Sequence, residues 1–502
     1  MRTIALLAAL ALALPGSLQA QIPRQEYAAR RDSLVSKIQD GALVVFGARE
    51  PQKDYLSFFQ EPNFLYLTGV REPNAALVIV KRGARTTGTI FVQPNDPAAE
   101  VWTGARMGLD TARARTGLVA RSSEDFMPVI DSLAGVVRTI YVVGEFSDDE
   151  DPLEPSEQGM SFDQEVMRAI AGRHDSLALS NVTPVVLRLR AKKSPAELEL
   201  IRTAVNITVE AHRQAFQAIE PDMNEFEIQA LIEYMFRRNG ADRPSFATIV
   251  GSGPNSTTLH YNADDRFMRA GDVVVMDIGA SYRGYAADVT RTVPVSGTFS
   301  TEQRAIYQLV RDAQAAAEKA ATPGASFGSM SQAASETIER GLARIGLIEA
   351  VGAVVEGGEA LCGQAGASCP QWTMYYMHGL GHGIGLDVHD PEQAYYQGGR
   401  IGVGSAFTIE PGVYVRSKLL SIIPDTPKNR AMIAKIRPAV ERYANIGVRI
   451  EDDYIITANG VEWISKAPRE IGEVEALMAQ RWAGVPARNA ELVRRYERTG
   501  SQ

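Results

Sequence analysis

Four acidic residues lie in apolar stretches where buried strands are expected. Asp277 and Asp288 are the first and last residues of the stretch DIGASYRGYAAD, Glu410 lies in FTIEPGVY, and Glu451 lies in VRIEDDY. A buried carboxylate without a partner is strongly disfavoured. Four carboxylates could instead neutralise two divalent cations, and one imidazole would complete an oxygen-rich site of the kind that suits Mn²⁺, Co²⁺, Fe²⁺ or Zn²⁺. This acidic set therefore predicts a metal centre.

The stretch 277–288 predicts a hairpin. With its turn centred on Tyr282–Arg283, Asp277 and Asp288 would face each other directly, and like charges opposed across a strand pair weaken a sheet. Such a pair taken alone is more often a polar turn, or occasionally a calcium site. Two metals roughly 3.5–4 Å apart that share a hydroxide would give the aspartates a common partner. We therefore expect Asp277 and Asp288 to be metal ligands.

The six histidines are unevenly placed. His174 and His212 lie in helical stretches without chemical neighbours, whereas His260 lies in TTLHYNAD, and His378, His382 and His389 lie in HGLGHGIGLDVHD. The glycines of this second motif argue against a helix, so the four-residue spacing is not that of a helical zinc motif. In an extended chain, His378 and His382 would share a face and His389 would point elsewhere.

Length and composition limit the class of protein. A chain of 502 residues predicts two domains, and 45% hydrophobic with 22% charged residues is ordinary for a globular protein. The net charge of −8 provides no basic field, so we expect no nucleic-acid partner.

The N-terminus has the layout of a secretory signal peptide. Arg2 precedes an apolar run over 4–14, and a cut after Ala20 would remove residues 1–20. The run is shorter than the roughly 20 residues that span a bilayer, although an uncleaved anchor remains the alternative. We expect a periplasmic or secreted protein. In that compartment, Cys362 and Cys369 predict a local disulfide, the alternative being two free thiols.

Residues 24–188 mix helical and strand signals. Four buried strands are expected, at ALVVFGA, AALVIVKRG, GTIFVQP and RTIYVVGEF. A domain boundary is expected at RLRAKKSP, because a strong helix start follows it. Ser194 is the expected cap, Pro195 takes the first helical position, and Glu197 completes a capping box.

The second part, 194–482, predicts helices separated by strand hairpins. Further helices are expected from Asn224 to Gly240, from Ser300, and over about 329–344. The expected strands are ATIVGSG, DVVVMDIGA, AADVTRTVPV, SAFTIEPGVYV and GVRIEDDYIIT. Helices with a mainly antiparallel sheet make an α+β domain rather than a doubly wound one. Residues 483–502 remain as a C-terminal tail.

The motif order resembles a known family. MDIGASYRGYAADVTRT, HGLGHGIGLDVHD, TIEPGVY and RIEDD are similar to the motifs of the pita-bread metallopeptidases, specifically aminopeptidase P (Xaa-Pro aminopeptidase) and its relative prolidase. EPNFLYLTGVREPNAALVIV resembles the N-terminal domain of aminopeptidase P. The resemblance implies a smaller α/β domain over 24–188 and a pita-bread catalytic domain over 194–482. It also implies hydrolysis of the bond before a proline at the second position of a peptide.

The resemblance also implies the metal ligands. They are Asp277, Asp288, His382, Glu410 and Glu451, holding two divalent ions per subunit, Mn²⁺ first with Co²⁺, Zn²⁺ or Fe²⁺ as alternatives. Asp288 and Glu451 would bridge the metals, Asp277 would bind one, and His382 with Glu410 the other.

Further residues match the catalytic and substrate-contacting positions of the family. Glu410 would accept the proton of the attacking water, His389 would stabilise the oxyanion, and His260 would help to protonate the departing proline nitrogen. Arg449 would orient the carboxylates. His378 and Tyr414 would wall the proline pocket, with ordinary strand packing left open for Tyr414.

Two alternatives to an aminopeptidase remain. Prolidase, which cleaves only Xaa-Pro dipeptides, shares the ligand set, and a non-catalytic peptide-binding module would be expected to have lost some of it. Two insertions, 351–371 and 417–441, depart from the shorter bacterial pattern and bear on peptide length and on the expected homodimer or homotetramer.

Overall fold

The computed structural model describes residues 22–53, 56–146, 152–154, 159–391, 399–480 and 482–487. The predicted leader 1–20 and most of the predicted tail 483–502 lie outside these residues. Within the described ranges, none of the helices has both the length and the apolar character needed to cross a membrane.

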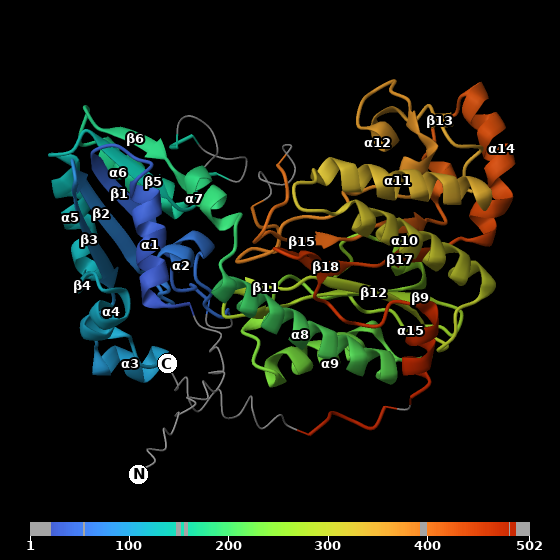
Figure 1. The fold of residues 1–502 in the computed structure, drawn as a ribbon, viewed down its shortest axis with the longest axis horizontal. Helices are drawn as coiled ribbons and strands as arrows, with labels where there is room; N and C mark the ends of the chain where they lie inside the picture. The colour runs from blue at the N-terminus through green and yellow to red at the C-terminus, as the bar shows by residue number, and fades with distance from the viewer. Residues whose placement is uncertain are drawn as a thin grey trace, which may run out of the picture.

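The N-terminal domain is built on a six-stranded mixed sheet, at the left of Figure 1. In spatial order its strands are β4 (Val119–Ser122), β3 (Arg85–Val92), β2 (Ala76–Arg82), β1 (Gly41–Phe46), β5 (Thr139–Val143) and β6 (Ala178–Asn181). Strand β1 runs antiparallel to β2 and parallel to β5. All four strands expected from the sequence are present.

Helices cover both faces of this sheet. They are α1 (Arg24–Val35), α2 (Pro62–Thr68), α3 (Pro97–Thr103), α4 (Gly108–Thr116), α5 (Phe126–Ala134), α6 (Phe162–Ala171) and α7 (Thr183–Arg190). Strand β1 is buried along its whole length. Its alternate residues enter different cores, Val44 with Ile130 of α5 and Leu43 with Leu34 of α1, because successive side chains point to opposite faces. This is the smaller α/β domain that the sequence resemblance implied.

The two domains are joined by a short connection. Helix α7 ends at Arg190, and α8 (Pro195–Ala218) begins shortly after it with the predicted capping box of Ser194 and Glu197. The backbone N–H of Lys193 donates to the carbonyl of Gly404 at 2.9 Å, so the connection is fixed to the second domain before α8 starts.

The helices of the second domain lie on opposite sides of its strands in Figure 1, with α8, α9 and α15 below and α10 and α11 above. Their bounds are α9 (Glu225–Arg238), α10 (Thr301–Ala320), α11 (Phe327–Arg344), α12 (Gly358–Cys362), α14 (Pro427–Arg442) and α15 (Ile471–Met478). The predicted start at Asn224 is confirmed by a capping box with Glu227.

The described strand pairs of this domain are all antiparallel. The strands are β7 (Arg243–Pro244), β8 (Ile249–Ser252), β9 (Val273–Ile278), β10 (Ala280–Tyr282), β11 (Tyr285–Ala286), β12 (Val289–Pro294), β13 (Val354–Val355), β14 (Cys369–Pro370), β15 (Ala406–Ile409), β16 (Gly412–Val415), β17 (Ile446–Arg449), β18 (Asp452–Thr457) and β19 (Gly460–Trp463). The α+β class is therefore confirmed.

The predicted turn of the 277–288 hairpin is wrong by one position, so the predicted strand partner of Asp277 is wrong by two residues. The turn lies at Arg283–Gly284, both with positive φ (53° and 86°), so Tyr282 pairs with Tyr285. Two residues with positive φ define the type I′ turn, whose twist matches that of the strands. Asp277 consequently lies opposite Thr290, and Asp288 lies in the break between β11 and β12.

The two insertions pack against each other at the edge of the second domain, around α12, β13 and α14 (Figure 1). The side-chain amide of Asn429 donates to the carbonyl of Glu356 at 2.9 Å, and Thr426 donates to the Glu356 carboxylate at 2.5 Å. The predicted disulfide between Cys362 and Cys369 is present. The two insertions thus form one lobe.

Candidate metal centre

Three of the four carboxylates lie where the chain leaves a strand. Glu410 separates β15 from β16, Glu451 separates β17 from β18, and Asp288 separates β11 from β12. The sequence predicted each of these stretches as one continuous strand, and the structure corrects this. At a break the backbone is released from the ladder, so the side chains of different sheets can turn toward one point. Asp277 alone lies within a strand, β9.

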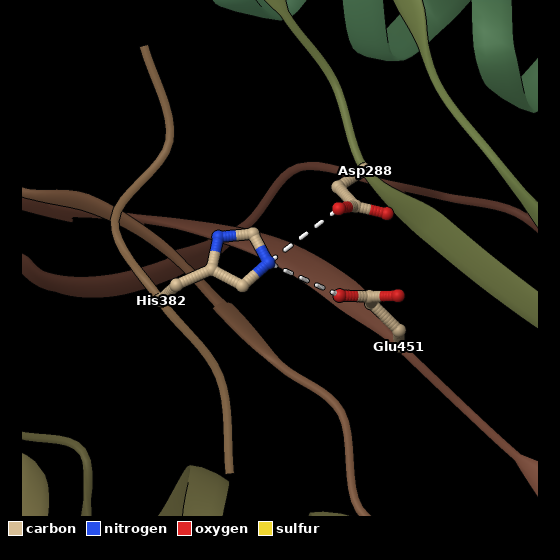
Figure 2. Close-up of side chains that lie close together, drawn as sticks. All are labelled: Asp288, His382 and Glu451. Carbon is tan, nitrogen blue, oxygen red and sulfur yellow. Dashed lines mark ion pairs between the residues drawn. The ribbon is translucent and has the colours of Figure 1, made fainter. Parts of the chain in front are cut away.

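The side chains meet around His382. Its Nε2 lies 3.5 Å from Oδ2 of Asp288, 3.6 Å from Oε1 of Glu410 and 4.0 Å from Oε1 of Glu451. Figure 2 shows the imidazole pointing between the carboxylates of Asp288 and Glu451, which come from different segments. One potential ligand atom from each of these three residues lies within 4.8 Å of the others.

The carboxylates repel one another. Burial raises the pKa of Asp288 well above its usual range, and the charges of Glu451, Asp277 and Glu410 raise it further. Burial and Glu451 do the same to the pKa of Glu410. Burial and Asp277 raise the pKa of Glu451 to about 8. The negative charge of these three carboxylates is thus not compensated by the protein's own cations.

Asp277 behaves differently because Arg449 lies against it. Burial alone would raise the pKa of Asp277, but the Arg449 guanidinium, paired with Oδ2, lowers it below the ordinary value. Arg449 also donates to the hydroxyl of Tyr414 at 2.8 Å. The ion pair with Asp277 is therefore a contact through which Arg449 would orient the carboxylates, as predicted.

These residues fit a divalent metal site. Among the described residues, no hydrogen-bond donor reaches Oδ1 of Asp277, Oδ1 of Asp288 or Oε1 of Glu451, although all three atoms are buried. Burial lowers the pKa of His382 to about 4, with a further contribution from His389, so its imidazole is neutral at pH 7. A neutral imidazole with unpaired carboxylate oxygens is the donor set that Mn²⁺, Co²⁺, Fe²⁺ and Zn²⁺ accept.

The other predicted histidines surround this centre unequally. The ring of His389 is exposed, and its centroid lies 4.1 Å from that of His382. The expectation that His389 points away is therefore wrong, because residues 383–390 turn back instead of continuing extended. His378 and His382 do share a face, since Nδ1 of His378 lies 3.7 Å from Oε2 of Glu410. His260 is exposed in the loop after β8.

His378 is fixed by Tyr414. Its Nε2 lies 2.8 Å from the tyrosine hydroxyl, and its ring makes an edge contact with Tyr376, whose centroid is 5.0 Å away. Tyr414 itself is fully buried, and its hydroxyl is shared by His378 and Arg449. Trp372, which follows the disulfide-containing insertion, packs on Tyr376.

Three supporting residues were not identified from the sequence. Thr290 donates to Oε2 of Glu451 at 2.6 Å, and the backbone N–H of Asp288 donates to Asp453 at 3.1 Å. His212 is buried in α8 with Nε2 2.9 Å from the carbonyl of Val289. The run of three acidic residues at 451–453 was a sequence signal for Asp453. A threonine on a strand or a histidine on a helix gives no such signal until its tertiary contacts are known.

Comparisons with known proteins agree with this site. Residues 199–458 match the model of metallopeptidase family M24, and residues 27–141 match that of the aminopeptidase P N-terminal domain. The Xaa-Pro aminopeptidases of Haemophilus influenzae and Escherichia coli are each 34% identical to this chain and cover 91% of it and 98% of their own length. Human Xaa-Pro dipeptidase is 28% identical and covers 91% of this chain and 94% of its own length.

A solved structure is similar throughout. Aminopeptidase P from Escherichia coli with the inhibitor Pro-Leu superposes with a TM-score of 0.75 at 30% identity, covering 91% of this chain and 99% of that one. Matching family models for both domains, together with relatives above 30% identity along nearly their whole length, place the chain without ambiguity. This protein belongs to metallopeptidase family M24, as a pita-bread metallopeptidase of the aminopeptidase P type.

Proposed function

We propose that this metallopeptidase is an Xaa-Pro aminopeptidase, which releases the N-terminal residue from peptides that have proline at the second position. The observation that carries the proposal is the meeting of four carboxylates and a neutral imidazole around one centre, which is buried except at Glu410. A non-catalytic peptide-binding module has no need of this costly set of like charges. The Escherichia coli relative has been solved with substrate, which supports a peptide ligand.

Asp277, Asp288, His382, Glu410 and Glu451 would hold two divalent ions, for which we propose Mn²⁺, with Co²⁺, Zn²⁺ or Fe²⁺ as alternatives. When bound, such ions lower the pKa of a water from about 15.7 towards ~7 and polarise a substrate carbonyl. A zinc-substituted form of the Escherichia coli relative supports tolerance of more than one metal in the family.

Glu410 is the proposed acceptor of the attacking water's proton. It is partly exposed, unlike Glu451, and its carboxylate lies between the imidazoles of His378 and His382. This position beside the ligand set is that of a group that can take a proton from a bound water and later give it up. His389, exposed beside His382, would donate to the developing oxyanion, and His260 would assist protonation of the proline nitrogen.

Selectivity for proline would come from shape and from hydrogen bonding. The bond before proline has no amide hydrogen, so the site need not provide an acceptor for it. His378, held by Tyr414 and Tyr376, is proposed to pack against the pyrrolidine ring. Because the Tyr414 ring is fully buried, its proposed part is to position His378.

We also propose that the protein is exported and acts on extracytoplasmic peptides as a homodimer or homotetramer. The Cys362–Cys369 disulfide supports this location, since disulfides persist mainly in oxidising compartments. Fractionation of the native host for the protein, and light scattering of the purified enzyme, test these two points separately.

One experiment tests the function. Purified protein is analysed for metal content and assayed with Xaa-Pro-Xaa tripeptides, Xaa-Pro dipeptides, and tripeptides with alanine in place of proline. The proposal expects cleavage of the proline tripeptide and little cleavage of the alanine control. Cleavage of the dipeptide alone would identify a prolidase, the activity named for the human relative. A folded, metal-replete protein that cleaves neither would refute the proposal.

A further inference from the structure

An ionic cluster, buried except at Asp387, joins the short connection between the domains to the loop that follows His382. Its cations are Arg190, the last residue of α7, and Lys193, and its anions are Asp387 and Asp390 from the loop that carries His389. We name these four residues the linker cluster. Its two cations lie outside both segments that match family models, residues 27–141 and 199–458.

The charges of the linker cluster are directly paired. Nζ of Lys193 lies 2.8 Å from Oδ2 of Asp390, and both side chains are 1% exposed. Arg190 pairs with Oδ1 of the same carboxylate and with Oδ2 of Asp387 at 2.5 Å. Asp390 therefore has a cation on each of its oxygens. Removing one partner of a buried ion pair strongly destabilises a protein, because the other charge is left buried without a counter-charge. Each cation therefore constrains the position of Asp390.

Asp390 in turn constrains the loop. Its backbone N–H donates to the carbonyl of Gly383 at 2.9 Å, and Gly385 donates to the carbonyl of Asp387 at 3.0 Å. The packing leaves no space at Gly385, where a Cβ would lie 2.3 Å from Oδ2 of Asp390 and 3.0 Å from Cε of Lys193. The turn 383–390 thus packs tightly against the side chain of Lys193.

This turn joins the metal centre to the exposed histidine. His382 directly precedes it, and His389 lies immediately before Asp390. The two imidazoles lie against each other with centroids 4.1 Å apart, although they are well separated along the chain. Only a turn of fixed shape holds His389 over His382, since an extended chain would carry it away.

The cluster also contacts the N-terminal domain. Nη1 of Arg190 donates to Oδ1 of Asn63 in α2 at 2.7 Å, and the Asn63 amide donates to Glu61 at 2.8 Å. The position of the His389 turn therefore depends on both domains, as well as on the second domain's own strands.

We infer that Lys193 and Arg190 are positioning residues for catalysis: through Asp390 they fix the turn that places His389 beside the metal-binding His382. The inference rests on the proposed function for its kinetic consequences only. Both cations pair with Asp390, and Arg190 also pairs with Asp387, so the effect that we infer passes through the turn that carries these two aspartates. Groups that orient catalytic side chains in this way are typically worth about 10–100-fold in activity.

The first test replaces the buried lysine and, as a matched control, its exposed neighbour. Lys193→Met is expected to lower kcat on an Xaa-Pro tripeptide by about 10–100-fold, with metal content unchanged and KM changed less than kcat. Lys193→Arg keeps the charge and is expected to restore much of the rate. Lys192→Met should behave as wild type. A wild-type kcat for Lys193→Met would overturn the inference.

The second test asks whether the lysine acts through His389. In a His389→Ala background, Lys193→Met is expected to cause little further loss of kcat, because the group that it positions is already absent. An equal loss in both backgrounds would indicate a general structural role and would refute the inference. If Lys193→Met alone does not fold, the double variant Lys193→Met, Asp390→Asn removes both charges. A wild-type kcat in that variant would refute the inference as well.

A third measurement does not depend on activity. Hydrogen–deuterium exchange of peptides covering 383–390 is expected to be about tenfold faster or more in Lys193→Met than in wild type, and unchanged in Lys192→Met. Unchanged exchange in Lys193→Met would refute the positioning role. If the wild-type protein cleaves no Xaa-Pro peptide, the proposed function fails, while this exchange measurement still decides whether the lysine holds the turn.

Discussion

Arg449 and Asp277 form a buried ion pair at the edge of the metal centre. The pair makes Asp277 the one member of the acidic set with a lowered pKa, while the pKa values of Asp288, Glu410 and Glu451 are all raised. The fixed guanidinium thus keeps one ligand ionised before any metal arrives. The remaining carboxylates must exchange protons for metal.

Replacing Arg449 is expected to change the proton balance of metal binding. In Arg449→Met, burial and like charges would raise the pKa of Asp277, so the metal-free variant binds about one more proton near pH 7. Metal binding should then release about one more proton than in wild type. Calorimetric titration in two buffers of different ionisation enthalpy measures this number. Arg449→Lys, which keeps the charge, is the control, and an unchanged proton number in Arg449→Met would contradict the assigned role.

The metal-free protein is expected to lose stability as pH rises from 6.5 to 8. The pKa of Glu451 is raised to about 8, so the folded state retains a proton that the unfolded chain has lost, and the free energy of unfolding falls with pH. The amount is roughly 2 kcal/mol for each proton retained across this window. Buried His212, His378 and His382 also have pKa values lowered from 6.5, and their opposite contribution ends about one pH unit above that unfolded value, so it reduces the slope only in the lower part of this window.

Denaturant unfolding of the metal-free protein at several pH values checks this slope. Glu451→Gln should give a flatter profile, because the amide does not titrate. Saturating Mn²⁺ should also flatten it, since bound metal displaces the retained protons. A metal-free stability that rises between pH 6.5 and 8 would contradict the raised pKa values.

Asp288→Asn is expected to remove both metal and activity. One oxygen of the Asp288 side chain lies 3.5 Å from Nε2 of His382, and the other is buried without a donor among the described residues, so both are available as ligands. We expect metal content to fall to one ion or fewer and kcat/KM to fall by at least ~10³-fold. Elemental analysis after dialysis against free metal measures the first quantity. Asp312→Asn, on the exposed side of α10, is the control. Full metal content in Asp288→Asn would exclude a bridging role.

The sequence singled out the acidic residues of this centre, but the residues alone did not choose His382 from the other histidines of its motif. An acid in an apolar stretch is costly, so Glu410 and Glu451 stood out from their neighbours along the chain, as did the caps of α8 and α9. The resemblance then supplied the roles. The strand breaks were not predictable, because apolar residues continue on both sides of each glutamate.

Contacts between distant segments were also beyond the sequence. The hairpin register depended on a turn at Arg283–Gly284, one position from the expected turn, and this shifted Asp277 from Asp288 to Thr290. The linker cluster joins residues 200 positions apart, Arg190 with Asp390. No local pattern distinguishes buried Lys193 from exposed Lys192, since only packing decides which lysine meets an acid.

His389→Ala is expected to keep the metals and lose the rate. His389 is exposed beside His382, where its ring can reach a bound peptide without belonging to the buried ligand set. Loss of an oxyanion donor costs about 10²–10³-fold in kcat. Steady-state kinetics on an Xaa-Pro tripeptide, together with metal analysis of the same preparation, separate the two effects. His174→Ala, in the N-terminal domain beside Asp131, is the matched control and should leave both quantities unchanged. A rate near wild type would exclude His389 from the reaction, whereas loss of metal would show that its ring supports the ligand His382 instead of the substrate.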